Sequence, residues 1–99
     1  MAEAAPVTIG LLEMDVLTPG ARSLKDKRRI IKSLKQLLHN RFNCSVAETG
    51  DKDLWGRAQL AVCVVSDDAR HANEQLNEIV RFSADKAGAE LIDYRIEML

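Results

Sequence analysis

The stretch that decides the fold is RSLKDKRRIIKSLKQLL, residues 22–38, which has the spacing of a helix with one apolar face. At about 100° per residue, its apolar side chains recur every three or four positions and share one side of the predicted helix. These side chains are Leu24, Ile30, Ile31, Leu34, Leu37 and Leu38. Ser23 is a good N-cap with Asp26 three residues later, so the helix is predicted to begin at Ser23 and to end near Asn40.

On either side of this helix, alternating and continuous apolar runs predict four strands and a second helix. The predicted strands are residues 7–17, 44–49, 57–66 and 90–99. The second helix is predicted at residues 67–84, with Ser66 or Asp67 as its cap and Gly88 as its end. Its predicted apolar stripe is Ala69, Ala72, Leu76, Ile79, Val80 and Ser83. The order βαββαβ predicts an α+β, ferredoxin-like fold, with a four-stranded antiparallel sheet and two helices on one face.

Length and composition predict one small domain. Residues 1–6 are expected to form a flexible leader and residues 7–99 a single ferredoxin-like domain, with an apolar content of 46% that is enough for one core. No apolar run reaches the roughly 18 residues that span a membrane, so no membrane partner is expected. Cys44 and Cys63 are too few and too far apart for a disulfide framework or a zinc site, which favours a reducing cytoplasm.

Positive charge is concentrated in the first helix, although the net charge of the chain is only −1. Residues 22–41 hold eight basic residues and one acid, a balance of +7, whereas the rest holds six basic residues and fourteen acids, a balance of −8. Five cations share an arc of about 120° opposite the apolar face. They are Lys25, Arg28, Arg29, Lys32 and Lys35. Like charges at this spacing repel one another, so an anionic partner explains the arrangement better than helix stability does.

Two structural explanations stand beside an anion-binding face. The long side chains are simply solvated, or they pair with acids of the second helix, and such surface pairs contribute about 0–1 kcal/mol. The candidate acids are Asp68, Glu74, Glu78 and Asp85. Lys27 falls inside the apolar arc, where it either reaches past the sheet edge or joins Arg22 and the free backbone N–H groups of residues 23–25 in an anion site.

Three runs of the sequence resemble the YlxP-like family of bacterial proteins, a domain of unknown function. These runs are PGARSLKDKRRIIKSL at residues 19–34, NRFNCSVAETGDKDLWGRAQLAV at residues 40–62 and VVSDDARH at residues 64–71. The resemblance extends from about Val7 to Glu97 and implies a ferredoxin-like fold. The family is typically encoded among genes for translation initiation and ribosome maturation, which implies a connection to RNA or the ribosome by association. The resemblance implies no catalytic residues.

Other candidate sites carry weaker signals. Residues 51–56, DKDLWG, begin like a calcium loop, but Trp55 occupies the fifth position, where an oxygen ligand belongs. His39 and His71 have no partner at the spacing of a triad or metal site, so neither catalytic residues, a metal nor a cofactor is predicted. Trp55, with Arg57 nearby, either covers the edge of the core or is a candidate contact for a base or a protein partner.

The leading hypothesis is a non-enzymatic RNA-binding or ribosome-associated accessory protein. The predicted phosphate contacts are Arg22, Lys25, Lys27, Arg28, Arg29, Lys32 and Lys35. The two central strands carry no aromatic residue, so contacts through the helix are expected rather than base stacking on the sheet. One alternative is a dimeric structural or regulatory module that associates through an apolar sheet face and binds a small ligand. Another is an acylphosphatase-like enzyme with phosphate held at Arg22, although the rest of that family's pattern is absent. The residues expected on the apolar sheet face are Leu11, Ala61, Cys63 and Val65.

Overall fold

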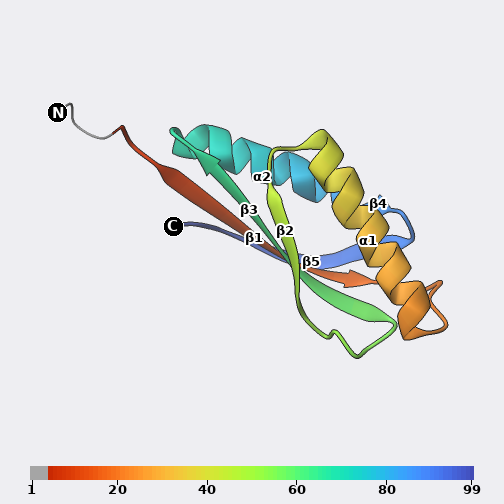
Figure 1. The fold of residues 1–99 in the computed structure, drawn as a ribbon. Helices are drawn as coiled ribbons and strands as arrows, with labels where there is room; N and C mark the ends of the chain where they lie inside the picture. Colours follow the sequence, from red (N-terminus) through yellow and green to blue (C-terminus); the bar gives the residue numbers. More distant parts are fainter. Residues whose placement is uncertain (1–4) are drawn as a thin grey trace.

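The computed structural model describes residues 5–99, which form an antiparallel sheet with two helices on one face (Figure 1). In chain order the elements are β1 (Thr8–Leu17), α1 (Leu24–Arg41), β2 (Ser45–Gly50), β3 (Arg57–Ser66), α2 (Ala69–Ser83), β4 (Asp85–Lys86) and β5 (Ala89–Met98). The strands lie in the order β2-β3-β1-β5-β4, so β1 is at the centre of the sheet. The predicted α+β class is confirmed. Most of the predicted leader, residues 1–6, lies outside the described residues.

The sheet has five strands, one more than predicted. The additional strand, β4, pairs with the start of β5 through a two-residue turn in which both residues have positive φ, 56° at Ala87 and 87° at Gly88. Such turns match the twist of the flanking strands, and they are usually signalled by Asn-Gly or Asp-Gly rather than Ala-Gly. The sequence pattern therefore did not reveal β4. Gly88 forms this turn instead of ending α2, whose last residue is Ser83.

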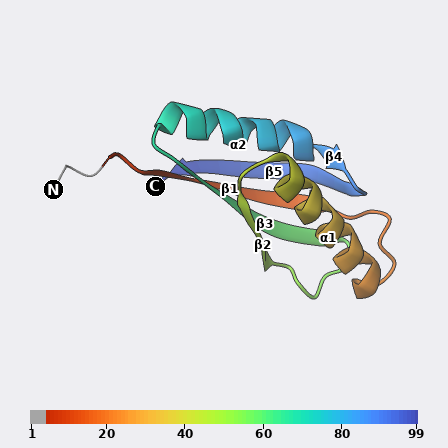
Figure 2. The same cartoon turned by 45° about the horizontal axis from the view of Figure 1, so that its top comes forward.

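Both helices lie on the same side of the sheet (Figure 2), and one hydrophobic core fills the space between the two layers. β1 and β3 pair in a register that places Leu12 opposite Val62 and Met14 opposite Leu60, and all four residues are buried. The helices complete the core with Ile31, Leu34 and Leu38 from α1 and Ala72, Leu76 and Ile79 from α2. α1 lies over the β2 side of the sheet and α2 over β1 and β5. The alternation predicted for β1 is thereby confirmed.

The buried faces of the helices differ from the predicted stripes at three positions. Leu37 is 37% exposed, and Lys27 is buried in the apolar arc of α1. Ala69, at the start of α2, is exposed because the helix begins there and has not yet reached the sheet. Phe82 lies off the stripe of α2 because its ring packs edge-on against Phe42, with 5.6 Å between the ring centroids. This contact joins the last turns of the two helices.

The N-terminal ends of both helices are capped by side chains. Ser23 is the N-cap of α1, as predicted, and its hydroxyl accepts a hydrogen bond from the Asp26 N–H at 3.0 Å. The N-cap of α2 is Asp68 rather than Ser66 or Asp67, and its carboxylate accepts from the Arg70 N–H at 3.0 Å. Within residues 5–99, neither helix combines the length and apolar character needed to cross a membrane.

Candidate nucleic-acid interface

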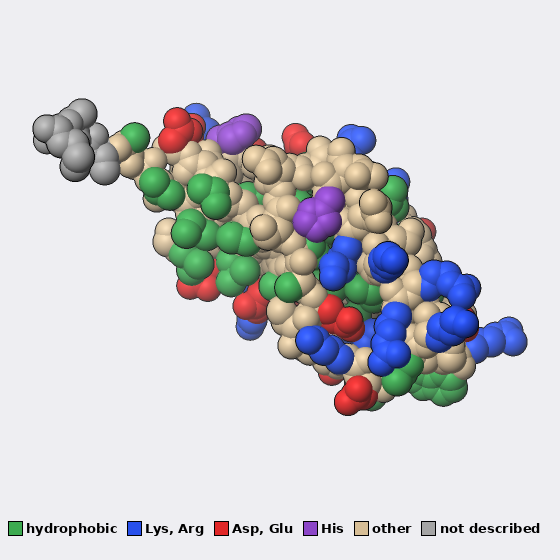
Figure 3. Space-filling model, viewed as in Figure 1, with side chains coloured by type: hydrophobic (Ala, Val, Ile, Leu, Met, Phe, Trp, Pro, Cys, Tyr) green, Lys and Arg blue, Asp and Glu red, His purple; other side chains and the backbone are tan. Residues whose placement is uncertain are grey.

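Positive side chains gather on the outer face of α1 (Figure 3). We call this group the cationic stripe, and its members are Lys25, Arg28, Arg29, Lys32 and Lys35. The first four are exposed and Lys35 is partly buried. Across residues 5–99, no ion pair joins a member of the stripe to a carboxylate, so the predicted pairing with acids of α2 is not found. The positive charge of this face is therefore left uncompensated by the described residues.

Lys27 lies apart from the stripe and has a structural role. Its side chain is 1% exposed, its Nζ is 3.0 Å from Oε2 of Glu48, and it donates a hydrogen bond to the carbonyl of Asp51. Glu48 points inward because β2 pairs with β3 in the register that places Glu48 opposite Leu60. The ion pair and the carbonyl offset the cost of burying the ammonium. Lys27 is thus withdrawn from the surface where a phosphate would bind, contrary to its predicted place.

The start of α1 already holds an anion of its own. The carboxylate of Asp26 accepts a hydrogen bond from the Arg22 N–H at 3.0 Å, while the Asp26 N–H donates to Ser23. This arrangement resembles a capping box, with Arg22 in place of the N-cap residue as the donor, and it sets a carboxylate at the helix start where an external anion would bind. Because Lys27 also turns away, the predicted anion site at the helix start is not assembled. The Arg22 side chain remains exposed.

The loop between β2 and β3, residues 51–56, is tied to the end of β1 by a buried threonine. The Thr18 hydroxyl donates to the carbonyl of Trp55 at 2.8 Å, and the Thr18 N–H donates to the carbonyl of Gly56 at 2.9 Å. Thr18 is fully buried, whereas the Trp55 and Leu54 side chains are each 52% exposed. About half of Trp55 is therefore open to solvent, so it does not act mainly as a cover for the core, and its role as a partner contact stays a prediction.

Arg57, the second candidate partner contact, is engaged in ion pairs. Its Nε is 3.5 Å from the Asp51 carboxylate, and its Nη2 is 3.8 Å from the Asp15 carboxylate. Asp51 has a positive φ of 58°, a conformation that aspartate tolerates better than most residues. Its carbonyl accepts from the Leu54 N–H at 3.0 Å as well as from Lys27. Arg57 therefore stabilises the loop and is directed toward the open face of the sheet.

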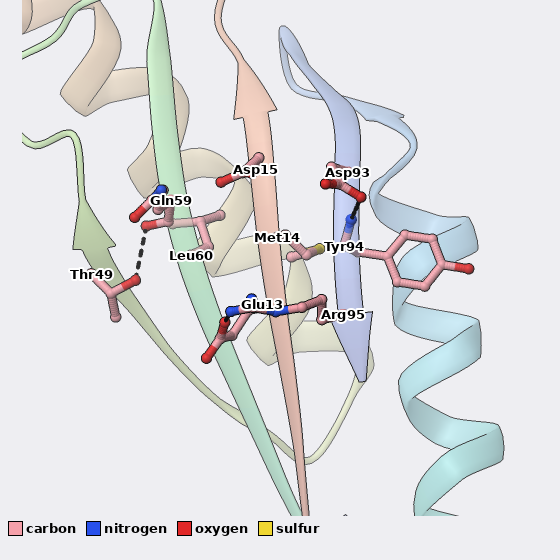
Figure 4. Close-up of a pocket in the computed structure, with 9 residues that line it drawn as sticks. All are labelled: Glu13, Met14, Asp15, Thr49, Gln59, Leu60, Asp93, Tyr94 and Arg95. Atoms are coloured by element: carbon pink, nitrogen blue, oxygen red, sulfur yellow. Dashed lines mark hydrogen bonds and ion pairs between the residues drawn. The ribbon is translucent and has the colours of Figure 1, made fainter. Parts of the chain in front are cut away.

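The open face of the sheet holds a hollow of about 210 Å³ that is unsuited to phosphate. Figure 4 shows carboxylates of β1 and β5 on the side away from the helices, with the Tyr94 ring turned outward. Asp15 and Asp93 lie directly opposite each other on neighbouring strands. Arg95 pairs with Glu13, whose hydrogen bond and charge raise the pKa of Arg95 above its ordinary value. In this hollow Arg95 is already paired with a carboxylate, and the other charged side chains are acids. Their negative charge repels a nucleic-acid backbone.

Neither cysteine nor histidine adds a reactive cluster. Burial raises the pKa of the Cys44 thiol, which packs against the core, so little reactive thiolate forms near neutral pH. Cys63 lies opposite Ser45 and Leu11 on the open face, on the other side of the sheet from Cys44. Within residues 5–99, no three His, Cys, Asp or Glu side chains are grouped as a metal site would require.

Two residues of this region were missed from the sequence. The sequence does contain a signal for Glu48. A lysine inside an apolar helix arc needs a carboxylate partner on the inward side of a neighbouring strand. Thr18 has no such signal, since a Thr-Pro-Gly run after a strand simply predicts a turn. Its role depends on a contact with Trp55, 37 residues away.

Comparison with known proteins confirms the family resemblance. The family described as "Protein of unknown function (DUF503)" matches residues 9–96. The chain is 31% identical over 74 residues to "Uncharacterized protein YlxP" of Bacillus subtilis (strain 168), which covers 75% of this chain and 80% of that protein.

Similarity to solved structures concerns the fold alone. The de novo designed protein Foldit4 has a TM-score of 0.52 at 14% identity, covering 93% of this chain and 96% of that one. A C-terminal segment of the alpha subunit of aIF2 from Pyrococcus abyssi has a TM-score of 0.46 at 16% identity, covering 95% of this chain and 50% of that one. The second value is too low to support an inference.

Proposed function

The chain belongs to the DUF503 family, and we propose that it is a non-enzymatic protein that binds RNA through the cationic stripe on α1, with ribosomal RNA as the first candidate. The observation that carries this proposal is the set of five cations on one helix face without a carboxylate partner among residues 5–99. We also infer that the fold is ferredoxin-like, with the order β2-β3-β1-β5 extended at one edge by β4.

The physical basis is counterion release. From Lys25 to Lys35 the stripe extends for about 15 Å along the helix, enough to lie along several phosphates. Each phosphate that a Lys or Arg neutralises releases condensed ions, which favours binding at low salt. A duplex RNA presents phosphates and hydroxyls rather than readable base edges in its deep groove, so such contacts recognise the shape of the RNA.

Binding through the helix also fits the distribution of acids. The open face of the sheet carries Glu13, Asp15 and Asp93, whereas the outer face of α1 carries Asp26 as its one acid, and Asp26 is occupied by the hydrogen bond from the Arg22 N–H. A polyanion is therefore expected to approach from the α1 side.

The test is fluorescence anisotropy with a structured fragment of small-subunit ribosomal RNA, at about 50 and about 200 mM salt. The Arg28→Ala/Arg29→Ala variant should bind at least tenfold more weakly, and its slope of log K against log salt should be shallower by about 1.5. The matched control is Arg70→Ala/Arg81→Ala, which removes two exposed arginines from α2. The control should bind like the wild type.

Two results would contradict the proposal. One is that the wild type does not bind the RNA at low salt. The other is that the α1 and α2 variants lose affinity equally, because the effect would then reflect net charge rather than the stripe.

A second candidate function is association of two copies through the apolar end of the open face. Val65 is 66% exposed and lies opposite Ile9, which is 38% exposed, next to the Leu11 and Cys63 pair. Sheets pack face to face through such residues. Sedimentation equilibrium would show a dimer that Val65→Asp dissociates; a wild type that stays monomeric at high micromolar concentration excludes this role.

A further inference from the structure

We propose that the loop of residues 51–56 carries a base-stacking site, in which the indole of Trp55 stacks on an unpaired nucleobase next to the RNA phosphates held by the cationic stripe. The inference rests on the proposed function and deepens it. It identifies the ligand as a structured RNA with an unpaired nucleotide beside a stem, rather than a continuous duplex.

The first observation is that the loop is held in place while its largest side chain is left exposed. Thr18 donates to the carbonyls of Trp55 and Gly56 at 2.8 and 2.9 Å, and Lys27 donates to the carbonyl of Asp51. The loop backbone is thus anchored at both ends by buried side chains. The Trp55 side chain nevertheless stays 52% exposed. Because the loop backbone is already held, little conformational entropy of that backbone is lost when a ligand binds.

The second observation is the position of the loop beside the stripe. Lys27, which contacts the loop, lies on α1 between Lys25 and Arg28. Thr18, which also contacts the loop, receives a hydrogen bond from the Ala21 N–H at 3.0 Å, two residues before the N-cap of α1. Figure 1 shows the β2–β3 loop and the start of α1 at the same end of the molecule. The loop that carries Trp55 is therefore bonded to the first turns of α1, the helix that bears the stripe.

The third observation is the charge of the loop, which argues for a base rather than a phosphate. The Asp51 carboxylate is paired with Arg57, and the exposed Lys52 and Asp53 have opposite charges. The loop has no surplus positive charge to attract a phosphate, so it offers mainly apolar and aromatic surface. Every nucleobase has a π face, and aromatic side chains stack on it without regard to sequence. In a duplex those faces are covered by neighbouring bases, so the partner must contain an unpaired nucleotide.

The experiment uses two synthetic RNA hairpins with the same stem, one fully paired and one with a single-adenosine bulge. Trp55 is the one tryptophan of the chain, so its emission reports directly on the loop. We expect the bulged hairpin to quench this emission more strongly than the paired hairpin. We also expect Trp55→Ala to weaken binding of the bulged hairpin by about tenfold while leaving the paired hairpin and the salt slope unchanged.

Two variants control for folding and for general apolar contact. Trp55→Phe should restore most of the affinity, because a phenyl ring also stacks. Leu54→Ala removes a neighbouring side chain that is exposed to the same 52%, and it should change neither affinity nor salt slope. Far-UV circular dichroism of all variants should match the wild type.

The outcomes separate this inference from the proposed function. If Trp55→Ala binds the bulged hairpin as tightly as the wild type, or if both hairpins quench the emission equally, the stacking site is excluded. Salt-dependent binding that requires Arg28 and Arg29 would still support the proposed function in that case. If the wild type binds neither hairpin, both proposals fail together.

Discussion

The two helices pack on the same face of the sheet, yet their outer surfaces carry charge in opposite ways. On α2, Arg70 is followed four residues later by Glu74, and Glu78 three residues later by Arg81, which is the spacing of stabilising pairs. On α1, every member of the cationic stripe has a neighbour of like sign at the same spacing. Because like charges destabilise an isolated helix, the outer face of α1 costs the fold stability, whereas the charge spacing on α2 supports it.

The inner faces differ as well. The buried face of α2 contains one polar residue, the small Ser83, but that of α1 contains the ammonium of Lys27. A buried cation persists only where a carboxylate and a carbonyl meet it, and here Glu48 and Asp51 do so. The inner face of α1 thereby holds the loop that carries Trp55. On one helix, the buried cation thus has a structural role, and the exposed cations are the ones proposed to bind RNA.

The largest effect is expected at the buried cation. Lys27→Ala should lower the free energy of unfolding by about 3 kcal/mol, because it leaves a cavity and removes the partner of Glu48. Lys25→Ala, two residues away on the exposed face, should change it by less than about 0.5 kcal/mol. Urea denaturation monitored by circular dichroism measures both values.

A double substitution that removes both charges of the buried pair sharpens this test. Lys27→Met/Glu48→Gln removes both charges at similar volume and should recover most of the lost stability. Equal effects of Lys27→Ala and Lys25→Ala would show that the buried pair does not contribute to the stability of the fold.

A smaller effect is expected where α2 approaches the sheet. A Cβ atom at Gly10 would lie 2.8 Å from Cδ1 of Leu76 and 3.3 Å from both Met98 and Val64. Gly10→Ala should therefore cost about 1–2 kcal/mol through overpacking, measured by thermal or urea unfolding. In a Leu76→Ala background the same change should cost at least about 0.5 kcal/mol less, because the clash is relieved.

Gly20 is the matched control for this substitution. A Cβ atom there would meet nothing within 4 Å. Gly20→Ala should leave stability unchanged or raise it slightly, since it restricts the unfolded chain. A Gly10→Ala protein as stable as Gly20→Ala would mean that α2 shifts freely on the sheet.

The smallest change in the free energy of unfolding is expected on the outer face of α1, where a substitution should stabilise the protein. Lys32→Glu places an acid three or four residues from Arg28, Arg29 and Lys35, so it should raise the free energy of unfolding by about 0.5–1 kcal/mol at low salt. The gain should fade at about 1 M salt, where these charges are screened. Affinity for RNA should fall in the same variant.

The equivalent exchange on α2 provides the comparison. Glu78→Lys places a cation between Glu74 and Arg81, so one attraction replaces another and no gain is expected. If Lys32→Glu destabilises the protein instead, the stripe is already balanced by groups of the fold, and its explanation as a binding face is lost.

The sequence by itself determined the features that depend on neighbouring residues. Ser23 and Asp26 capped α1 as predicted, and the alternation of Leu12, Met14 and Val16 placed them on the buried face of β1. The charge of the stripe was also readable, because residues three and four apart share a helix face wherever that helix is packed. Even so, Leu37 proved exposed, since the edge of a stripe depends on where the sheet lies.

Only the tertiary structure decided which cations face solvent and which support the fold. Lys27 meets the Asp51 carbonyl across 24 residues, and Thr18 meets Trp55 across 37. Glu48 reaches Lys27 because of the register between β2 and β3, and a shift of one residue would turn its side chain to the open face. Register and helix placement come from packing of the whole core, which no local pattern encodes. For that reason the sequence placed Lys27 among the phosphate contacts at the helix start, whereas the fold assigns it to the loop that presents Trp55.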